Sequence, residues 1–236
     1  MSVNRPVWKL KDWIDAEKLD WSLLSLNPNA IELLEENADK IDWSCLSSNP
    51  NAIKILEKNR DKIDWSNLSY NPNAIKLLEK HRDKINWFHL SMNSGAMFLI
   101  KNNIDKINWN YLAFNKNPEV IQLFKENPHK INWSLLSYNY NAIELLETNK
   151  DKINWDNFSY NSHYRAIALL ERNSNKIHWS NLSCNTNAYH ILNENQDRIN
   201  WSNISGNFNP NILKILEKNK NKINWCNLSS NPYIFI

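Results

Sequence analysis

The chain has few of the residues that build most enzyme sites. Its 236 residues include two glycines, three cysteines and six histidines. A glycine-rich phosphate loop is absent. Cys45, Cys184 and Cys226 have no metal-ligand spacing, and no two histidines form a His-x-x-x-His pair. The sequence therefore predicts no metal, no cofactor and no catalytic residue.

Long apolar runs and a strong excess of charge are also missing. No run of 18 apolar residues is present, so we expect no membrane span. The first residues lack the apolar core of a signal peptide. A net charge of +3 is too small to indicate a nucleic-acid partner. With three scattered cysteines, we expect a protein of a reducing cytoplasm.

Tryptophan, in contrast, recurs at a fixed register through almost the whole chain. Successive copies lie 22 or 24 residues apart, at positions 21, 43, 65, 87, 109, 133, 155, 179, 201 and 225. A fixed period in this range is the signature of a repeat array, in which each unit buries its apolar face against its neighbours. The sequence therefore predicts an elongated repeat protein rather than one or two globular domains.

Each repeat reads as two helices, as the third one illustrates. Asp64 is a good N-cap, and Trp65 and Leu68 lie three residues apart on one face of a short helix. Asn71 recurs in all ten repeats, and we expect it to supply a left-handed turn in a chain with almost no glycine. A second, amphipathic helix is predicted over Pro72–Lys80, with proline at its first position.

The predicted fold is an all-α solenoid of about ten two-helix units of 22–24 residues, stacked as a right-handed superhelix. Residues 1–20 would form an N-terminal capping segment with a helix at Asp12–Leu19, and residues 21–236 a single repeat domain that ends in a partial repeat. At about 8–10 Å per packed helix, we expect a rod or arc of roughly 80–100 Å.

Departures from the repeat fall in one place. Three repeats carry two extra residues directly after the recurring asparagine, which supports a turn there: Asn115–Glu119, Asn161–Arg165 and Asn207–Asn211. The fourth repeat lacks the proline that starts the second helix in the third repeat and has Gly95 one residue later. We expect a softer joint at this point.

The motif W-S-x-L-S-x-N-P-N-A-I-x-L-L-E-x-N, with D-K-I-[DN]-W between copies, covers roughly residues 20–236. It resembles a repeat family abundant in giant DNA viruses of amoebae. The resemblance implies a repeat protein of viral origin, located in the host cytoplasm or the virion. It implies no biochemical role.

Two variable columns, two and five residues after each tryptophan, share a face of the short helix. In the middle repeats this face is rich in aromatic and other large side chains, which are typical of interface cores. We expect a protein partner there, although these side chains could instead pack on neighbouring units. The candidate partner-binding residues are Tyr70, His89, Met92, Tyr111, Phe114, Leu135, Tyr138 and Tyr160.

A basic column recurs between the repeats. Aspartates precede most of its members, and each lies near a helix C-terminus where positive charge is favoured, so solvated lysines are the first interpretation and phosphate contact the second. The column comprises Lys40, Lys62, Lys84, Lys106, Lys130, Lys152, Lys176, Arg198 and Lys222.

The last four residues, Tyr233, Ile234, Phe235 and Ile236, are apolar and lack a polar cap. They could pack back on the array or associate with another chain, which gives a possible homo-oligomer. Since no repeat stands out chemically, the first hypothesis is a non-enzymatic scaffold that binds a host or viral protein through the short-helix face. The alternatives are a structural virion or assembly component that self-associates through its ends and, less favoured, nucleic-acid binding along the lysine-rich edge.

Overall fold

The computed structural model describes Leu10 and residues 16–234. The ordered elements of this part are helices: nineteen α-helices and eleven short 3-10 helices. The prediction of an all-α solenoid is confirmed.

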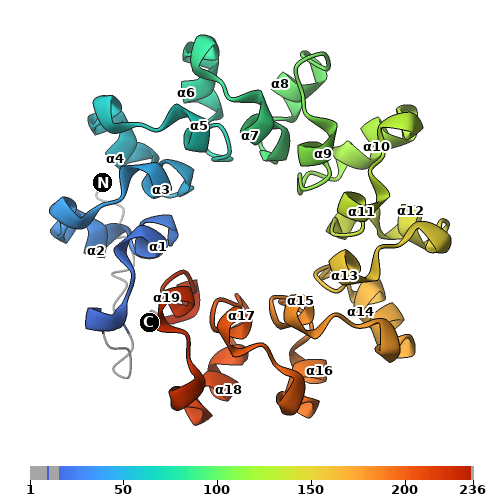
Figure 1. Ribbon diagram of the computed structural model, residues 1–236. Helices are drawn as coiled ribbons and strands as arrows, with labels where there is room; N and C mark the ends of the chain where they lie inside the picture. The colour runs from blue at the N-terminus through green and yellow to red at the C-terminus, as the bar shows by residue number, and fades with distance from the viewer. Residues whose placement is uncertain (1–9, 11–15, 235–236) are drawn as a thin grey trace, which may run out of the picture.

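The helices alternate between an inner and an outer layer (Figure 1). The short helices that begin with the repeat tryptophans form the inner layer: α1 (Trp21–Leu26), α3 (Trp43–Ser48), α5 (Trp65–Leu68), α7 (Trp87–Met92), α9 (Trp109–Leu112), α11 (Trp133–Leu136), α13 (Trp155–Phe158), α15 (Trp179–Ser183), α17 (Trp201–Ser205) and α19 (Trp225–Leu228). The second helices form the outer layer: α2 (Ile31–Glu36), α4 (Ile53–Lys58), α6 (Ile75–Lys80), α8 (Met97–Lys101), α10 (Glu119–Glu126), α12 (Ile143–Glu147), α14 (Tyr164–Arg172), α16 (Tyr189–Glu194) and α18 (Ile212–Lys218).

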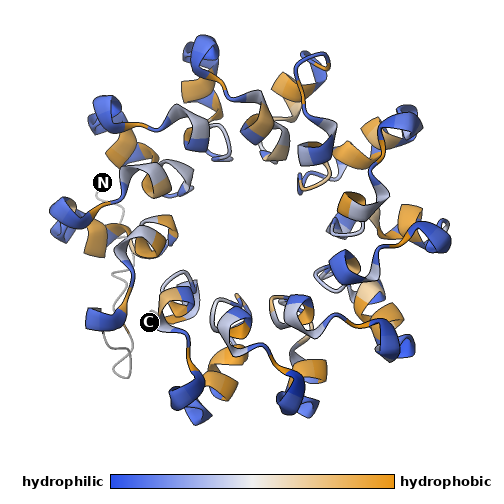
Figure 2. Ribbon diagram, in the orientation of Figure 1, coloured by the Kyte–Doolittle hydropathy of each residue, from blue (hydrophilic) through white to orange (hydrophobic). Residues whose placement is uncertain are grey.

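Most linkers from an outer helix back to the next inner helix contain a 3-10 turn. These turns are η2 (Ala38–Lys40), η3 (Arg60–Lys62), η4 (Arg82–Lys84), η5 (Pro128–Lys130), η7 (Lys150–Lys152), η8 (Ser174–Lys176), η9 (Gln196–Arg198) and η10 (Lys220–Lys222). Figure 2 shows them as the hydrophilic outer rim, while the apolar residues lie between the two layers.

Local sequence explains where each inner helix begins and what it buries. Asp42 is an N-cap in the extended region, and its carboxylate accepts from the backbone N of Cys45 at 3.0 Å. Leu46, three residues after the tryptophan, is fully buried against the outer layer. Ser47 is buried as well, and its hydroxyl donates to the carbonyl of Trp43 at 2.8 Å. The same oxygen accepts from the backbone N of Asp64 in the next unit at 3.0 Å.

The recurring asparagine does not adopt the left-handed conformation that we predicted. Asn49 is extended, with φ −73° and ψ 119°, and none of the described residues has a positive φ. The reason is that hydrogen bonds of the asparagine side chain hold the turn in place, so the backbone needs no left-handed conformation. The outer helix also starts later than predicted: α6 begins at Ile75, and Pro72 lies in the turn before it.

These asparagines form a buried ladder that joins every unit to the one before it. Asn49 Nδ2 donates to the carbonyls of Ser25 and Asn27, both at 2.9 Å, and Asn71 repeats the pattern on Ser47 and Asn49. The Oδ1 atom of Asn49 accepts from the backbone N of Asn51, which fixes the turn. Each amide thus pairs backbone carbonyls that are buried between units, which explains why asparagine recurs at this position in every unit.

The stack closes on itself instead of extending as a rod. Helix α19 lies beside α1 and completes a ring (Figure 1). Asn27 Nδ2 donates to the carbonyls of Ser229 at 3.3 Å and Asn231 at 3.4 Å, so the ladder continues across the ends of the chain. The backbone N of Asp20 donates to Ser229 Oγ at 2.9 Å, as Asp64 does to Ser47. The predicted rod or arc of roughly 80–100 Å is therefore wrong, because the rotation between units accumulates until the last unit bonds to the first.

The two ends of the chain share the tenth unit. Its inner helix α19 and the 3-10 turn η11 (Pro232–Ile234) come from the C-terminal end, and its linker turn η1 (Ala16–Lys18) comes from the N-terminal end. Lys18 Nζ lies 5.2 Å from the Trp225 ring centroid, as Lys40 lies 4.5 Å from that of Trp21. The helix predicted over Asp12–Leu19 is described only from residue 16, where this 3-10 turn begins.

The three insertions begin in turns between the layers, as predicted, but two of them run into the outer helix that follows: Glu119 begins α10, and Tyr164 begins α14. The three helices after the insertions, α10, α14 and α18, have eight, nine and seven residues. Gly95 permits close packing: a Cβ at this position would lie 2.5 Å from the Pro72 carbonyl oxygen. Glycine thus brings the Trp87 unit against its neighbour, and the softer joint that we expected there stays a prediction.

Candidate functional site

The surface that faces the axis of the ring is formed by one side of every inner helix; we call it the inner wall. The third and fourth residues after each tryptophan point to the outer layer and to the neighbouring unit. The residues one, two and five positions after it therefore face the ring axis, on the opposite side of the helix. This is the short-helix face that the sequence nominates for a partner.

The inner wall is almost free of charge. The ten inner helices contain no lysine or arginine, and Asp156 is their one carboxylate. Serine, asparagine and tyrosine recur on it, with phenylalanine, leucine, methionine and cysteine between them. The charged side chains lie on the outer layer, the turns and the linkers, which include the hydrophilic rim in Figure 2.

Several members of the inner wall hold adjacent units together. Asn67 Nδ2 donates to the carbonyl and hydroxyl of Ser44, and Asn203 does the same to Ser180. His89 stands at the equivalent position, and its Nδ1 lies 2.8 Å from the Ser66 carbonyl. His89, proposed from sequence as a partner-binding residue, is thus partly committed to the neighbouring unit.

Three aromatic rings on consecutive inner-wall units touch one another; we call them the aromatic cluster. The ring centroids of Phe114 and Tyr138 are 5.5 Å apart, edge to face, and those of Tyr138 and Tyr160 are 5.0 Å apart. Such pairs are typical of aromatic packing and fix the rings in place. The structure therefore brings together three of the eight residues that the sequence nominates.

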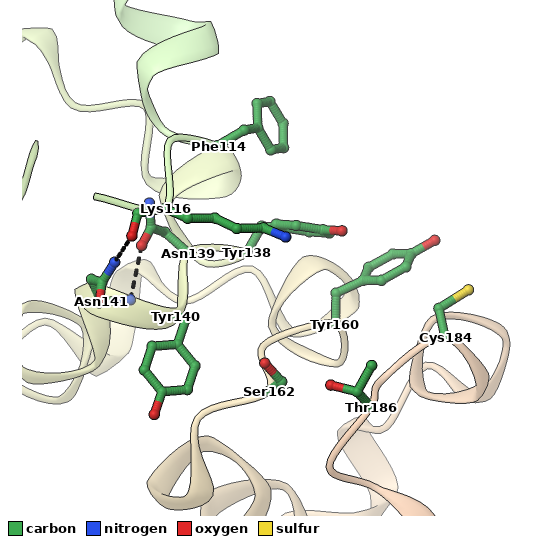
Figure 3. Close-up of a pocket in the computed structure, with 10 residues that line it drawn as sticks. All are labelled: Phe114, Lys116, Tyr138, Asn139, Tyr140, Asn141, Tyr160, Ser162, Cys184 and Thr186. Atoms are coloured by element: carbon green, nitrogen blue, oxygen red, sulfur yellow. Dashed lines mark hydrogen bonds between the residues drawn. The ribbon is translucent and has the colours of Figure 1, made fainter. Parts of the chain in front are cut away.

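The aromatic cluster borders a surface cavity of about 470 Å³ (Figure 3). The cavity spans four consecutive units. Each unit contributes the residue five positions after its tryptophan (Phe114, Tyr138, Tyr160, Cys184) and the residue seven positions after it, in the turn (Lys116, Tyr140, Ser162, Thr186). Asn139 and Asn141 complete the lining, and Asn141 Nδ2 donates to the Lys116 carbonyl at 2.8 Å.

The cavity carries one cation and no anion. Lys116 is the one charged side chain among the lining residues. Burial raises the pKa of the Tyr138 hydroxyl, and the neighbouring Tyr160 raises it further. Burial also raises the pKa of Tyr160 and of the Cys184 thiol. These three groups therefore stay neutral near pH 7, and the wall presents hydroxyls, rings and one ammonium group.

The other predicted residues lie elsewhere on the inner wall. Tyr70 is 40% exposed and lies outside the cavity. Tyr111 packs edge-on against Phe88 at 5.7 Å, and Met92 and Leu135 are half-buried. Sequence reasoning missed Phe88, which is 55% exposed beside Tyr111. The sequence did hold a sign of this residue, because Phe88 replaces the serine that usually follows the tryptophan.

A second stack of rings begins at Tyr140, on the turn side of the cavity. The ring centroids of Tyr140 and His163 are 4.7 Å apart, and those of His163 and Tyr164 are 4.6 Å apart. Tyr140 occupies the position where four units have proline, and His163 and Tyr164 belong to an insertion. These departures from the repeat could have indicated the second stack from the sequence. They were missed because the prediction considered only the two columns on the short helix.

The predicted C-terminal self-association residues differ in environment. Ile234 is fully buried, in the segment that closes the ring, whereas Tyr233 is exposed. Phe235 and Ile236 lie outside the described residues. The backbone N of Tyr233 donates to Asn231 Oδ1, which is part of the ladder. Ile234 is therefore committed within the chain and is not available to a second copy.

The basic column has a structural role that sequence reasoning missed. Lys62 Nζ lies 4.5 Å from the Trp43 ring centroid, Lys84 4.7 Å from that of Trp65, and Arg198 5.0 Å from that of Trp179. The same arrangement recurs around the ring, including Lys18 over Trp225. Cation–π contact thus holds these cations against the preceding tryptophan.

Within the described residues, no group of three His, Cys, Asp or Glu side chains could hold a metal ion. His190 Nε2 lies 2.6 Å from Glu171 Oε1 on the outer surface, with both side chains about half exposed. Burial and the nearby Asp42 raise the pKa of Cys45 to about 11, which opposes thiolate chemistry. None of the described helices is both long and apolar enough to cross a membrane.

No protein-family model, no curated protein and no solved structure matches this chain.

Proposed function

We propose that the protein is a non-enzymatic scaffold that binds an extended segment of a partner protein on its inner wall, at the aromatic cluster of Phe114, Tyr138 and Tyr160. The observation that carries the proposal is this cluster, with two ring contacts of 5.0–5.5 Å, beside a 470 Å³ cavity. Aromatic side chains are enriched at interface cores, and they bind with little loss of conformational freedom because they have two rotatable angles.

The composition of the inner wall supports a protein ligand. Tyrosine, serine and asparagine dominate it, and these residues also dominate the binding loops of antibodies, where they combine rigid contact area with adaptable hydrogen bonds. A nucleic acid would require cations along its path, and the inner helices have none.

The alternatives have less support. Assembly through chain ends requires an open end, but Ile234 is buried and the first unit bonds to the last. Phosphate binding along the linkers would compete with the cation–π contacts that eight of the nine cations of the basic column make. A viral source, and a location in the host cytoplasm or the virion, stay predictions.

Selection from a displayed library of random twelve-residue peptides tests the proposal. We expect the wild-type chain to enrich a defined set, and the double variant Phe114→Asp/Tyr138→Asp to enrich none, with its helical circular dichroism unchanged. Phe98→Asp is the matched control, because Phe98 is a 69% exposed ring on outer helix α8. The control should select the same peptides as the wild type. Equal enrichment by the double variant, or no enrichment by the wild type, would refute the proposal.

A further inference from the structure

The cavity beside the aromatic cluster has features that narrow the class of partner segment. Its lining comes from four consecutive units, two positions in each, so it runs along the ring rather than into it. A volume of about 470 Å³ shared by four units makes a shallow groove. It fits an extended chain better than an α-helix, which has a diameter of about 10 Å.

The backbone of the ligand would find no partner for strand pairing. Addition of a β-strand requires an exposed sheet edge, and the described residues form no sheet. A polyproline II segment needs no such pairing, because its backbone makes no regular hydrogen bonds. Aromatic-lined grooves recognise such segments, whose ordering cost is already low.

The spacing of the rings fits one turn of this conformation. One polyproline II turn advances about 9 Å over three residues. The ring centroids are 5.5 Å apart between Phe114 and Tyr138 and 5.0 Å apart between Tyr138 and Tyr160. One turn of ligand would therefore span the aromatic cluster from Phe114 to Tyr160.

Charge adds a further constraint. Lys116 is the one charged side chain of the lining and is exposed, at the Phe114 end of the groove. No carboxylate lines the cavity, so an acidic ligand group meets one ammonium group and no repulsion. A single-stranded nucleic acid could also stack on the rings, but it requires a positive groove along its backbone, and one cation in four units does not supply that.

We propose that this groove binds a proline-rich segment of the partner that carries a single acidic side chain opposite Lys116, an inference that rests on the proposed function. The rings of Tyr138 and Tyr160 hold the prolines, and the hydroxyls of Ser162 and Thr186 are placed to donate to the ligand carbonyls.

The test uses fluorescein-labelled twelve-residue peptides of proline with one central glutamate, glutamine or lysine, and twelve-nucleotide oligodeoxythymidylate as a fourth probe. Binding is followed by fluorescence anisotropy. We expect the glutamate peptide to bind about threefold more tightly than the glutamine peptide, as suits one exposed ion pair, and the lysine peptide to bind least. Lys116→Gln should abolish the difference between glutamate and glutamine, whereas Lys54→Gln, at an exposed lysine of outer helix α4, should not.

The aromatic cluster has its own matched control. Phe98, a 69% exposed ring on outer helix α8, is the control for Tyr138. Tyr138→Ala should weaken binding of the glutamate peptide at least tenfold, and Phe98→Ala should leave it unchanged. Equal losses in the two variants, no preference for glutamate, or tighter binding of the oligonucleotide would overturn the inference. If the proline peptides fail while the random library still enriches binders, the inference falls and the scaffold proposal stands; if both fail, both fall.

Discussion

Asn27 and Ser229, separated by 202 residues in sequence, are joined by a buried hydrogen bond from Asn27 Nδ2 to the Ser229 carbonyl. The bond repeats the one between Asn49 and Ser25 within the array. The ring is therefore closed by the same contacts that hold its neighbouring units together. Most of the predictions below follow from that closure or from the contacts repeated around it.

The first prediction compares the closing asparagine with an internal one. Asn27→Ala should lower the free energy of unfolding by about 2–4 kcal/mol, because it removes two buried hydrogen bonds and leaves carbonyls unpaired. Asn71→Ala should cost a similar amount, since Asn71 makes the same bonds to Ser47 and Asn49. Urea unfolding followed by circular dichroism measures both. An open array would instead make Asn27→Ala nearly neutral, because Asn27 would have no unit to bond to.

The second prediction concerns oligomeric state. Deletion of residues 225–236 removes the inner helix of the tenth unit and leaves the first and ninth units with exposed faces. Light scattering over a range of concentration should show that the full chain is a monomer and that the deleted chain self-associates, because open apolar ends associate. A full chain that forms dimers, or a deleted chain that stays monomeric at every concentration, would contradict this.

The third prediction concerns the cations over the tryptophans. Lys62→Gln should lower the free energy of unfolding by about 0.5–1 kcal/mol, the magnitude of an exposed cation–π contact. Lys62 Nζ lies 4.5 Å from the Trp43 ring centroid.

Lys130→Gln is the matched control for Lys62→Gln. Lys130 occupies the same column, but Trp109, the tryptophan of its unit, packs edge-on against Phe124 at 5.8 Å. The control should be neutral within about 0.5 kcal/mol, as surface substitutions usually are. An equal loss of unfolding free energy in Lys62→Gln and Lys130→Gln would contradict this prediction. It would show that general electrostatics, rather than contact with the tryptophan side chain, explains why these cations recur at one position of each repeat.

The fourth prediction is a pH dependence. The backbone N–H of Cys45 donates to the Asp42 carboxylate and holds its pKa below the ordinary value of 3.8. A carboxylate with a depressed folded-state pKa stabilises the protein above pH 3.8, and this contribution is lost as the pH falls through the lower folded-state pKa. Asp42→Asn keeps the cap, as Asn86 shows in its own unit, and removes the ionisation.

Urea unfolding of the two proteins at pH 7 and pH 3 checks this. The wild type should lose stability relative to Asp42→Asn on acidification. The same difference at both pH values would mean that the cap acts through its geometry alone.

The repeat made most of the fold predictable. Trp65 and Leu68, three residues apart, indicated a short helix, and the amphipathic run up to Lys80 indicated the second. Curvature could not be predicted, because it depends on the small rotation between packed units, which no single residue encodes. The role of Asn71 was missed because its amide bonds across units, to residues 22 and 24 positions earlier, whereas turn chemistry is judged locally.

The candidate site was predictable only in part. Phe114, Tyr138 and Tyr160 stood out because they share one column, and helical geometry places that column on one face. Lys116 and Tyr140 were not predicted, because they lie in turns where the sequence has no helical period. Their approach to the rings depends on the path of the chain between the layers, and only the structure supplies that path.

Closure also changes how the molecule can come apart. A linear array of ten units has nine interfaces and two ends, from which units can fray one at a time. In this ring, within the described residues, the ladder continues from the last unit to the first, so a single unit cannot detach without breaking contacts on both of its sides. Hydrogen exchange in the buried ladder should therefore be nearly uniform from the first unit to the last, and unfolding should be more cooperative than the short-range contacts of a repeat protein suggest.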